Sequence, residues 1–306
     1  MKKLKAHLQQ RNTIFILAIL GGLLTDYPTR WMQPLILPAL GMVMTLSVLN
    51  VPNSAFRSPR AMIAPVWMGI CMNYLLLGGV IIGLSFLLIH DPALRAGYIL
   101  IAASPPAIAS IPFTSILEGD ESFTLFSIVG GYLTALPVLP LIAFLFLDMS
   151  GFSPGSLVSA AGSLILLPVI ISRLLLWRGW HKTIEPVRGL LTDWSFFIVF
   201  YAIIGLNRRI ILGSPAMIIP VVSVAFLSIF ILGYLIERVG TKLHVKREIL
   251  TSLVLLGTLK NFGLAGGIAL TFFSRESALP SAICSIFLVL SIIWLDYRHK
   301  KKADNP

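Results

Sequence analysis

The stretch Leu256–Gly267 reads L-G-T-L-K-N-F-G-L-A-G-G and places one lysine in an otherwise apolar passage. Lys260 is the single charged residue of the run 249–273 and lies near its middle. About 20 apolar residues in a helix span the hydrocarbon core of a bilayer, so the run predicts a membrane helix with an ammonium near the bilayer centre. Such a charge costs about 2.5–3.5 kcal/mol on insertion scales and marks a functional site by default.

The composition extends this interpretation to the whole chain. Of 306 residues, 57% are hydrophobic and 12% are charged, and the mean hydropathy is +0.89. Soluble domains carry about 25% charged residues, so we expect a polytopic helical membrane protein in one domain, residues 1–306, surrounded by membrane lipids. Its net charge of +11 comes from short loops and the chain ends, which argues against a nucleic-acid partner. Cys71 and Cys284 both lie in apolar runs, so no disulfide or metal site is expected.

The apolar runs predict ten membrane segments. With both termini in the cytoplasm, 18 of the 24 Lys and Arg residues fall on the cytoplasmic side and 5 on the other side. The remaining one is Lys260, inside the ninth segment. The positive-inside rule therefore predicts this orientation in the cell (inner) membrane, with the basic N-terminal stretch retained as the start of the first helix. The segments are 13–25, 31–51, 61–89, 96–117, 122–147, 155–177, 189–206, 215–236, 249–273 and 277–296.

Two segments are interrupted at matching places. The fourth contains A-A-S-P-P-A-I-A-S, in which Pro105 and Pro106 remove two backbone donors, and the ninth has four glycines around Lys260. These breaks lie about half the chain apart, with five segments in each half. An odd number of segments per half predicts two inverted repeats, residues 1–150 and 151–306. Paired breaks in inverted repeats indicate the midplane site of a secondary transporter.

At these breaks the sequence resembles the bile acid:sodium symporter family. The matching stretches are S-P-P-A-I-A-S at 104–110, E-G-D-E-S-F-T-L at 118–125, N-F-G-L-A at 261–265 and A-L-P-S-A-I-C-S at 278–285. The likeness runs the length of the chain. It implies an all-α protein of ten transmembrane helices in a panel and a core, with segments four and nine crossing as broken helices. It also implies that a small organic anion binds beside the crossing.

The sequence departs from this family where sodium would bind. Aligned without gaps, the sodium-binding glutamate and glutamine of segment nine correspond to Leu256 and Lys260. The other ion-site equivalents are Asn73 for a glutamine of segment three, Ser110 for the serine of a Ser-Asn pair, and Thr124 for a serine of segment five. Hard cations choose oxygen ligands, and an ammonium repels them. We therefore expect sodium coupling of the family type to be lost.

Two compatible roles explain Lys260. Its ammonium can replace the lost cation by donating to carbonyls freed by Pro105, Pro106 and Pro112 and to Asn73. It can also bind an anionic substrate beside half-helix N-termini, whose amides favour negative charge, and we favour this functional role. Because burial disfavours the charged form of a lysine, Lys260 is also the candidate proton carrier if transport is coupled to protons.

The predicted substrate-binding residues are Lys260, Asn261, Ser104, Ser110 and Thr114. A helix–helix hydrogen bond is nearly as good an explanation for Asn261, and the hydroxyls can simply bond their own backbone. We find no pairing of residues within the segments that would support hydrolytic chemistry, so no enzyme activity and no cofactor are expected. The sequence predicts a sodium-independent transporter of a small organic anion. A sodium-coupled symporter of bile acid-like anions and a non-transporting membrane sensor remain alternatives.

Overall fold

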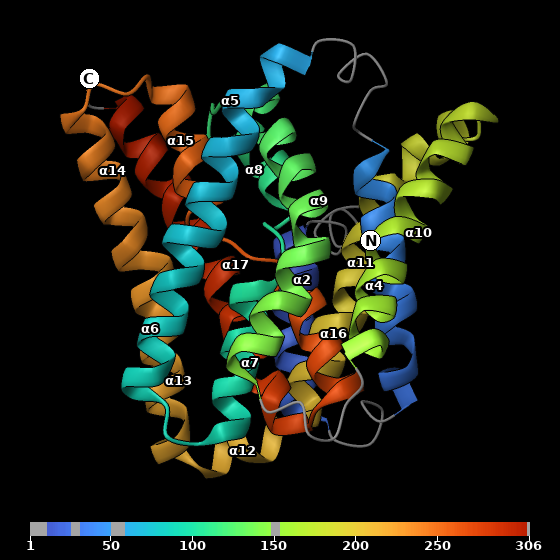
Figure 1. Cartoon of the computed structure of the whole chain (residues 1–306), viewed down its shortest axis with the longest axis vertical. Helices are drawn as coiled ribbons and strands as arrows, with labels where there is room; N and C mark the ends of the chain where they lie inside the picture. The colour runs from blue at the N-terminus through green and yellow to red at the C-terminus, as the bar shows by residue number, and fades with distance from the viewer. Residues whose placement is uncertain (1–10, 26–30, 50–58, 148–153, 305–306) are drawn as a thin grey trace, which may run out of the picture.

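The computed structural model describes residues 11–25, 31–49, 59–147 and 154–304, in which all regular elements are helices (Figure 1). The basic N-terminal stretch, residues 1–10, lies outside these ranges. In chain order the elements are α2 (Arg11–Leu24), η1 (Gln33–Leu35), α4 (Ile36–Val48), α5 (Pro59–Ile70), η3 (Cys71–Gly78), α6 (Gly79–Leu88), α7 (Pro92–Ala103), α8 (Ser110–Ile116), α9 (Glu121–Phe146), α10 (Pro154–Trp177), α11 (His181–Leu206), α12 (Arg208–Gly213), α13 (Pro215–Phe226), η4 (Leu227–Ile231), α14 (Leu232–Lys242), α15 (Arg247–Leu256), α16 (Phe262–Phe272) and α17 (Arg275–Asp304).

In the described residues, each predicted apolar segment overlaps one or more helices, and α14 and α17 continue beyond the predicted bounds to Lys242 and Asp304. Within the residues that the structure describes, five helices are long and apolar enough, by length and composition, to cross a membrane. They are Met62–Leu88, Glu121–Phe146, His181–Leu206, Pro215–Lys242 and Arg275–Leu295. The prediction for the seventh segment was wrong at its start, because α11 begins at His181 and not at residue 189. Five of the eight residues in these two extra turns are polar or charged, so a search for apolar runs does not detect this part of the helix.

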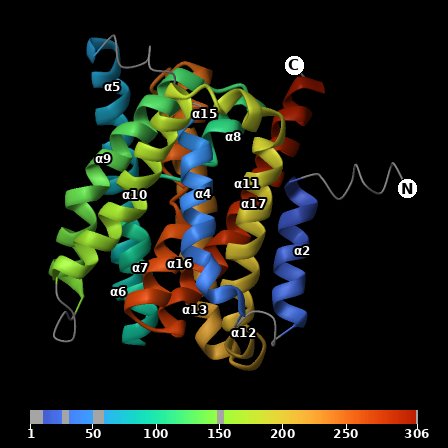
Figure 2. The same cartoon turned by 90° about the vertical axis from the view of Figure 1, so that its right-hand side faces the viewer.

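The helices form two groups. In one, α10, α4, α11 and α2 stand in a row, each packed on the next, as a layer one helix thick (Figure 2). The second group packs α7 against α9, α16 and α17, and surrounds them with the long helices made by α5–η3–α6 and α13–η4–α14. Helix α2 begins and α17 ends at the same end of the molecule (Figure 2). This arrangement agrees with an even number of crossings.

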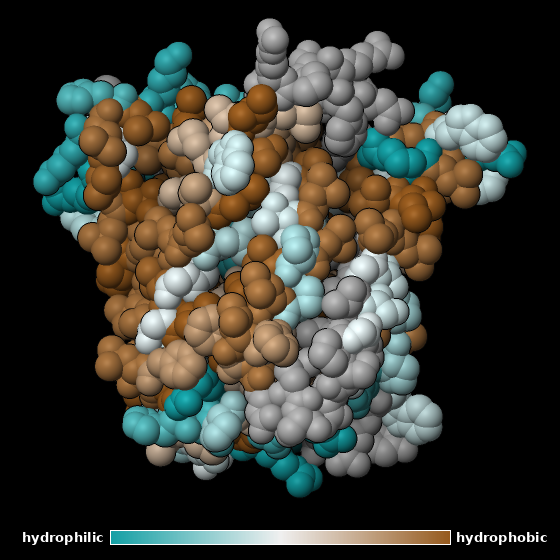
Figure 3. Space-filling view, in the orientation of Figure 1, coloured by the Kyte–Doolittle hydropathy of each residue, from teal (hydrophilic) through white to brown (hydrophobic). Residues whose placement is uncertain are grey.

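The outer surface is apolar around the middle of the molecule. Large side chains such as Leu87, Phe144 and Ile219 are more than 60% exposed. In the view of Figure 3, hydrophobic residues cover the central part of the face and hydrophilic residues gather at its two ends. A soluble protein rarely exposes so much contiguous apolar surface, whereas lipid tails provide the solvent that such a surface needs.

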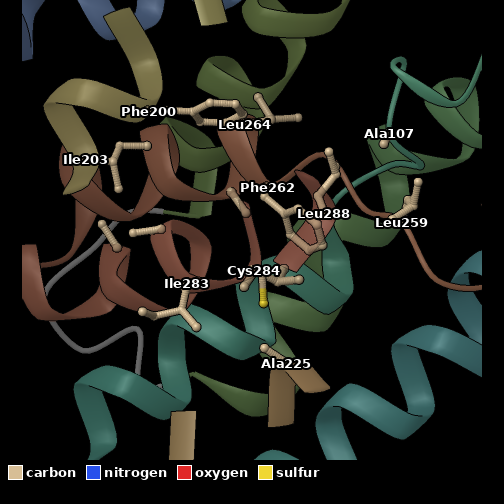
Figure 4. Close-up of a cluster of buried hydrophobic side chains, with 14 of the residues drawn as sticks. Ala107, Phe200, Ile203, Ala225, Leu259, Phe262, Leu264, Ile283, Cys284 and Leu288 are labelled. Atoms are coloured by element: carbon tan, nitrogen blue, oxygen red, sulfur yellow. The ribbon is translucent and has the colours of Figure 1, made fainter. Parts of the chain in front are cut away.

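Two segments break where the sequence predicted. The fourth consists of α7 and α8, separated by residues 104–109, and the ninth consists of α15 and α16, separated by residues 257–261. Their linkers run through the buried core. In Figure 4, Ala107 and Leu259 lie on these two non-helical segments. Phe262 and Leu288 pack together beside them, so apolar side chains close the core around the breaks.

Candidate functional site

The two linkers meet as a short antiparallel bridge between Pro106 and Lys260. Ala107 N–H donates to Leu259 O at 3.2 Å, and Asn261 N–H donates to Pro105 O at 2.9 Å. Irregular backbone at membrane depth is tolerated only where its polar groups find partners inside the protein. The bridge supplies such partners, and it places Lys260 directly beside the proline break.

The Lys260 ammonium replaces a donor that Pro106 lacks. The carbonyl of Ala102 would ordinarily accept from the backbone nitrogen of Pro106, which carries no hydrogen. Instead Lys260 Nζ donates to Ala102 O at 2.7 Å and to Ser104 O at 2.9 Å. These carbonyls form the C-terminal end of α7, where a helix carries partial negative charge and a cation is stabilised. The predicted interaction is confirmed for the carbonyl that Pro106 frees, Ala102 O. The carbonyls that Pro105 and Pro112 free, Ile101 O and Ile108 O, accept instead from Ser104 Oγ and Ile111 N–H.

An aromatic ring covers the third side of the ammonium. Lys260 Nζ lies 4.3 Å from the centroid of the Tyr74 ring, and the lysine is fully buried. A desolvated cation over a ring face gains about 2 kcal/mol. An ammonium has three N–H groups, so two carbonyls and one ring account for its donors in this conformation.

Asn73 acts on the other break. Its Nδ2 donates to Leu256 O at 3.0 Å and to Leu259 O at 3.3 Å, at the C-terminal end of α15. Its Oδ1 accepts no hydrogen bond among the described residues. The expectation that Lys260 donates to Asn73 was therefore wrong. The reason is geometric, because Asn73 and Tyr74 are consecutive in the π-helix η3 and only the tyrosine ring faces the ammonium.

Asn261 begins the second half of the ninth segment. Its Oδ1 accepts from Leu264 N–H at 3.0 Å, the usual N-cap arrangement for α16. Its Nδ2 donates to the hydroxyl of Tyr132, on α9, at 2.7 Å. The helix–helix hydrogen bond that was the alternative explanation is therefore present. Asn261 also lines a small cavity together with Lys260 and Phe200.

The predicted hydroxyl residues are fully buried beside the break. Ser104 Oγ donates to Ile101 O at 2.7 Å, the carbonyl that Pro105 leaves without its usual donor. Thr114 Oγ1 donates to Ser110 O at 2.7 Å and lies 3.0 Å from Thr124 Oγ1. Ser110 Oγ has no hydrogen-bond partner among the described residues. The hydroxyls of Ser104 and Thr114 thus satisfy backbone groups, and a role in binding substrate stays a prediction for these serine and threonine residues.

Sequence reasoning missed two tyrosines of the site, Tyr74 and Tyr132. Tyr74 stacks on the ammonium and donates through its hydroxyl to Gly131 O at 2.7 Å. Gly131 also lets α9 approach the break, because a Cβ there would lie 2.6 Å from Pro106 Cδ. Tyrosines are common at the ends of membrane helices, but both of these lie inside apolar runs, and that position was the available signal.

Apolar helices surround two broken helices that cross around a buried charge, and this arrangement is that of a multi-pass membrane transporter. The comparisons with known proteins give its family. The model of the sodium bile acid symporter family matches residues 37–214, more than half of the chain. The protein belongs to this family, as the sequence resemblance predicted. Members are transporters of small molecules and not enzymes, which confirms the prediction that this chain is not an enzyme.

Two relatives align over nearly the whole chain. The "Uncharacterized sodium-dependent transporter YocS" of Bacillus subtilis (strain 168) is 26% identical over 299 residues, covering 95% of this chain and 92% of its own length. The "Probable sodium/metabolite cotransporter BASS1, chloroplastic" of Arabidopsis thaliana is 24% identical over 308 residues, covering 94% of this chain and 74% of its own. Both names describe sodium-dependent transport, so the identity of the coupling ion is the central question for this chain.

Proposed function

We propose that this protein is a secondary-active transporter of a small organic anion that works by alternating access without bound sodium. Lys260 takes the place of the ion. Both termini lie in the cytoplasm, and the protein resides in the cell (inner) membrane. The family membership supports transport, and the hydrogen bonds of the Lys260 ammonium support the replacement of the ion.

The position of the ammonium carries the proposal. Helices α7 and α15 both end at the crossing, and their C-terminal carbonyls make this point of the core electronegative. A sodium ion can neutralise such a point only if several oxygens replace its hydration shell. Here a covalently attached cation donates to two of the carbonyls, and Leu256, fully buried, offers an apolar side chain where the family has a glutamate.

The repeated geometry supports two inverted halves, residues 1–150 and 151–306. Besides the two breaks, the described part of the chain has two π-helical segments, Cys71–Gly78 and Leu227–Ile231, each inside a long helix. They lie about half the chain apart, as the breaks do, and each precedes a broken segment. In a transporter built from inverted repeats, one group of helices rocks against the other around the site between them.

A permanently attached cation changes how transport can be driven. Sodium can be released and rebound in each cycle, whereas an ammonium stays with the protein and can exchange only its proton. The proposal therefore allows proton coupling or passive exchange of the anion, and Lys260 is the candidate proton carrier. Sodium coupling, which the names of the two relatives suggest, is the main alternative.

Thermal unfolding in sodium and potassium tests the proposal. We expect equal unfolding temperatures of the purified protein in NaCl and KCl at the same ionic strength, and equal anion uptake into proteoliposomes. The matched variant Leu256→Glu/Lys260→Gln restores the residue types of the family's sodium site. We expect it to gain a saturable stabilisation by sodium. Saturable, sodium-selective stabilisation of the unmodified protein would refute sodium independence.

A further inference from the structure

Two adjoining cavities lie between the layer of four helices and the broken helices. The larger, about 150 Å³, is lined by Phe15 of α2, by Phe196 and Arg188 of α11, and by Ile108 in the first linker. The smaller, about 20 Å³, reaches Lys260 and Asn261. They share Phe15 and Phe196 as lining, so a molecule in the larger cavity would lie next to the crossing.

Among the described residues that line the larger cavity, Arg188 is the one with a positively charged side chain. Its Nη1 lies 2.9 Å from Glu185 Oε2, one turn earlier on α11, with side chains 26% and 56% exposed. Such a pair on a helix surface contributes little, so another carboxylate can replace Glu185 without a large penalty. A guanidinium carries five donors in a planar fork and binds a carboxylate through two parallel hydrogen bonds.

The lysine at the crossing is differently placed. The Lys260 ammonium donates to Ala102 O and Ser104 O and lies under the Tyr74 ring, so binding an anion would require it to give up buried carbonyls that depend on it as a donor. Arg188 can bind an anion without leaving a buried carbonyl unsatisfied, since its partner is a half-exposed glutamate on its own helix. In this conformation Arg188, and not Lys260, is therefore placed to bind the charged end of an anion.

The cavity wall between the two cations is aromatic. The ring centroids of Phe15, Phe196 and Phe200 lie 5.3–5.7 Å apart in pairs. This cluster offers an apolar surface but no charge. Thr192, one turn beyond Arg188, adds a hydroxyl to the lining of the larger cavity. The combination suits a molecule with one anionic end and an apolar body.

We infer that Arg188 is the specificity-determining residue for the anionic end of the substrate, and that the substrate is a small monocarboxylate with a short apolar body. The carboxylate binds the guanidinium in place of Glu185, and the body lies against Phe15 and Phe196. The volume of about 150 Å³ is below the 300–1,000 Å³ typical of drug-sized ligands and limits the body to a few carbons. The described lining of this cavity holds one cation, Arg188, so a dianion would have no second positive charge to bind. The inference rests on the proposed function.

Calorimetric titration of the purified full chain with hexanoate and with hexanamide tests the inference. The two probes have nearly the same shape and differ in charge. We expect hexanoate to bind at least tenfold more tightly than hexanamide, because a hydrogen-bonded charge contributes about 1.5–3 kcal/mol. Arg188→Gln should weaken hexanoate binding about tenfold or more and leave hexanamide unchanged, and Arg188→Lys should weaken hexanoate about threefold.

The matched control is Arg178→Gln. Arg178 is exposed and lies over the ring of Trp177, and it is not among the residues that line the cavity. This variant removes the same charge and should bind hexanoate like the unmodified protein. Glu185→Gln should strengthen hexanoate binding two- to threefold, since it releases Arg188. The unfolding temperature of each variant shows whether it is folded.

Three results would overturn the inference: no hexanoate binding, equal binding of hexanamide, or unchanged hexanoate binding in Arg188→Gln. Uptake of a mixture of organic anions into proteoliposomes separates this failure from failure of the proposed function. If another anion accumulates while hexanoate does not bind, the transporter proposal stands and the assignment of Arg188 to a short monocarboxylate is wrong. If no anion accumulates, the proposed function itself fails.

Discussion

The two breaks at the crossing solve the same problem with different chemistry. The linker between α7 and α8 is made by prolines, and its freed carbonyls receive a charged donor, Lys260. The linker between α15 and α16 begins with Gly257, and the carbonyls of Leu256 and Leu259 receive a neutral amide, Asn73. The start of α16 is capped by a side chain, whereas α8 begins at Ser110 and its N-cap residue, Ala109, makes no side-chain cap.

This difference shows what a proline break requires. Glycine keeps its backbone N–H, so the chain can continue in turns, as Gly257 and Leu259 do by donating to Leu253 O and Leu255 O. Proline removes the donor permanently, and its carbonyl partner one turn earlier must find another. In the membrane core no water is present to help. A lysine reaching across from the other break is one solution, and it couples the two breaks to each other.

The largest effect is expected from Lys260→Met. The variant leaves Ala102 O and Ser104 O buried without this donor, and each unsatisfied carbonyl costs about 1–3 kcal/mol. Because removing the ammonium also removes its desolvation cost, we expect a net loss of about 3 kcal/mol. For a chain of this size that corresponds to a fall in unfolding temperature of about 6 °C. Thermal unfolding in detergent would measure it.

Lys260→Gln is the control for this variant. Glutamine can donate two hydrogen bonds to carbonyls but carries no charge. If the lysine serves the proline break through its donors, Lys260→Gln should recover more than half of the lost stability. Equal losses in both variants would show that the charge, and not the donors, stabilises the break.

A smaller effect is expected from removing the ring over the ammonium. Tyr74→Leu should lose about 2 kcal/mol more than Tyr74→Phe, because the cation–π contact is desolvated. Tyr74→Phe keeps the ring and removes the hydroxyl that donates to Gly131 O, so it should lose about 1 kcal/mol. In a double variant with Lys260→Met the losses should fall short of additivity by about 2 kcal/mol. Additive losses would mean that the ring and the ammonium do not interact.

Asn73→Leu tests the glycine-containing break. Leu256 O loses its amide donor, while Leu259 O keeps the donor Ala107 N–H. Asn73 Oδ1, which accepts no hydrogen bond among the described residues, is removed at the same time, so we expect a loss of only about 1 kcal/mol. A loss as large as that of Lys260→Met would contradict the view that the two breaks differ in their demand for an outside donor.

The smallest effect is expected from Ser104→Ala. Ile101 O loses the hydroxyl but keeps the backbone N–H of Ser104 at 3.1 Å, so the loss should be about 0.5 kcal/mol. Ser228→Ala is a matched control, since its buried hydroxyl also bonds carbonyls of its own helix, away from the breaks. Unfolding temperatures of the two variants should agree within about 1 °C. A much larger loss in Ser104→Ala would assign the serine a role beyond its own helix.

Much of the fold could be predicted because the membrane simplifies the problem. Every backbone polar group must be satisfied within the protein, so an apolar run of sufficient length predicts a helix. Pro105 and Pro106 predicted the first break for the same reason, since their missing donors are a covalent property. The extension of α11 back to His181 was missed, because outside the apolar region hydropathy no longer reports on helix.

The sequence by itself determined the class of protein, the two breaks and the buried position of Lys260, because each follows from residue chemistry and local spacing. Only the tertiary structure decided the partners. Tyr74 and Lys260 lie far apart in the chain, and nothing in local sequence places the ring on the ammonium or the amide of Asn73 on Leu256 O. Such contacts depend on how separate helices pack, and packing is set by side-chain shape over the whole core.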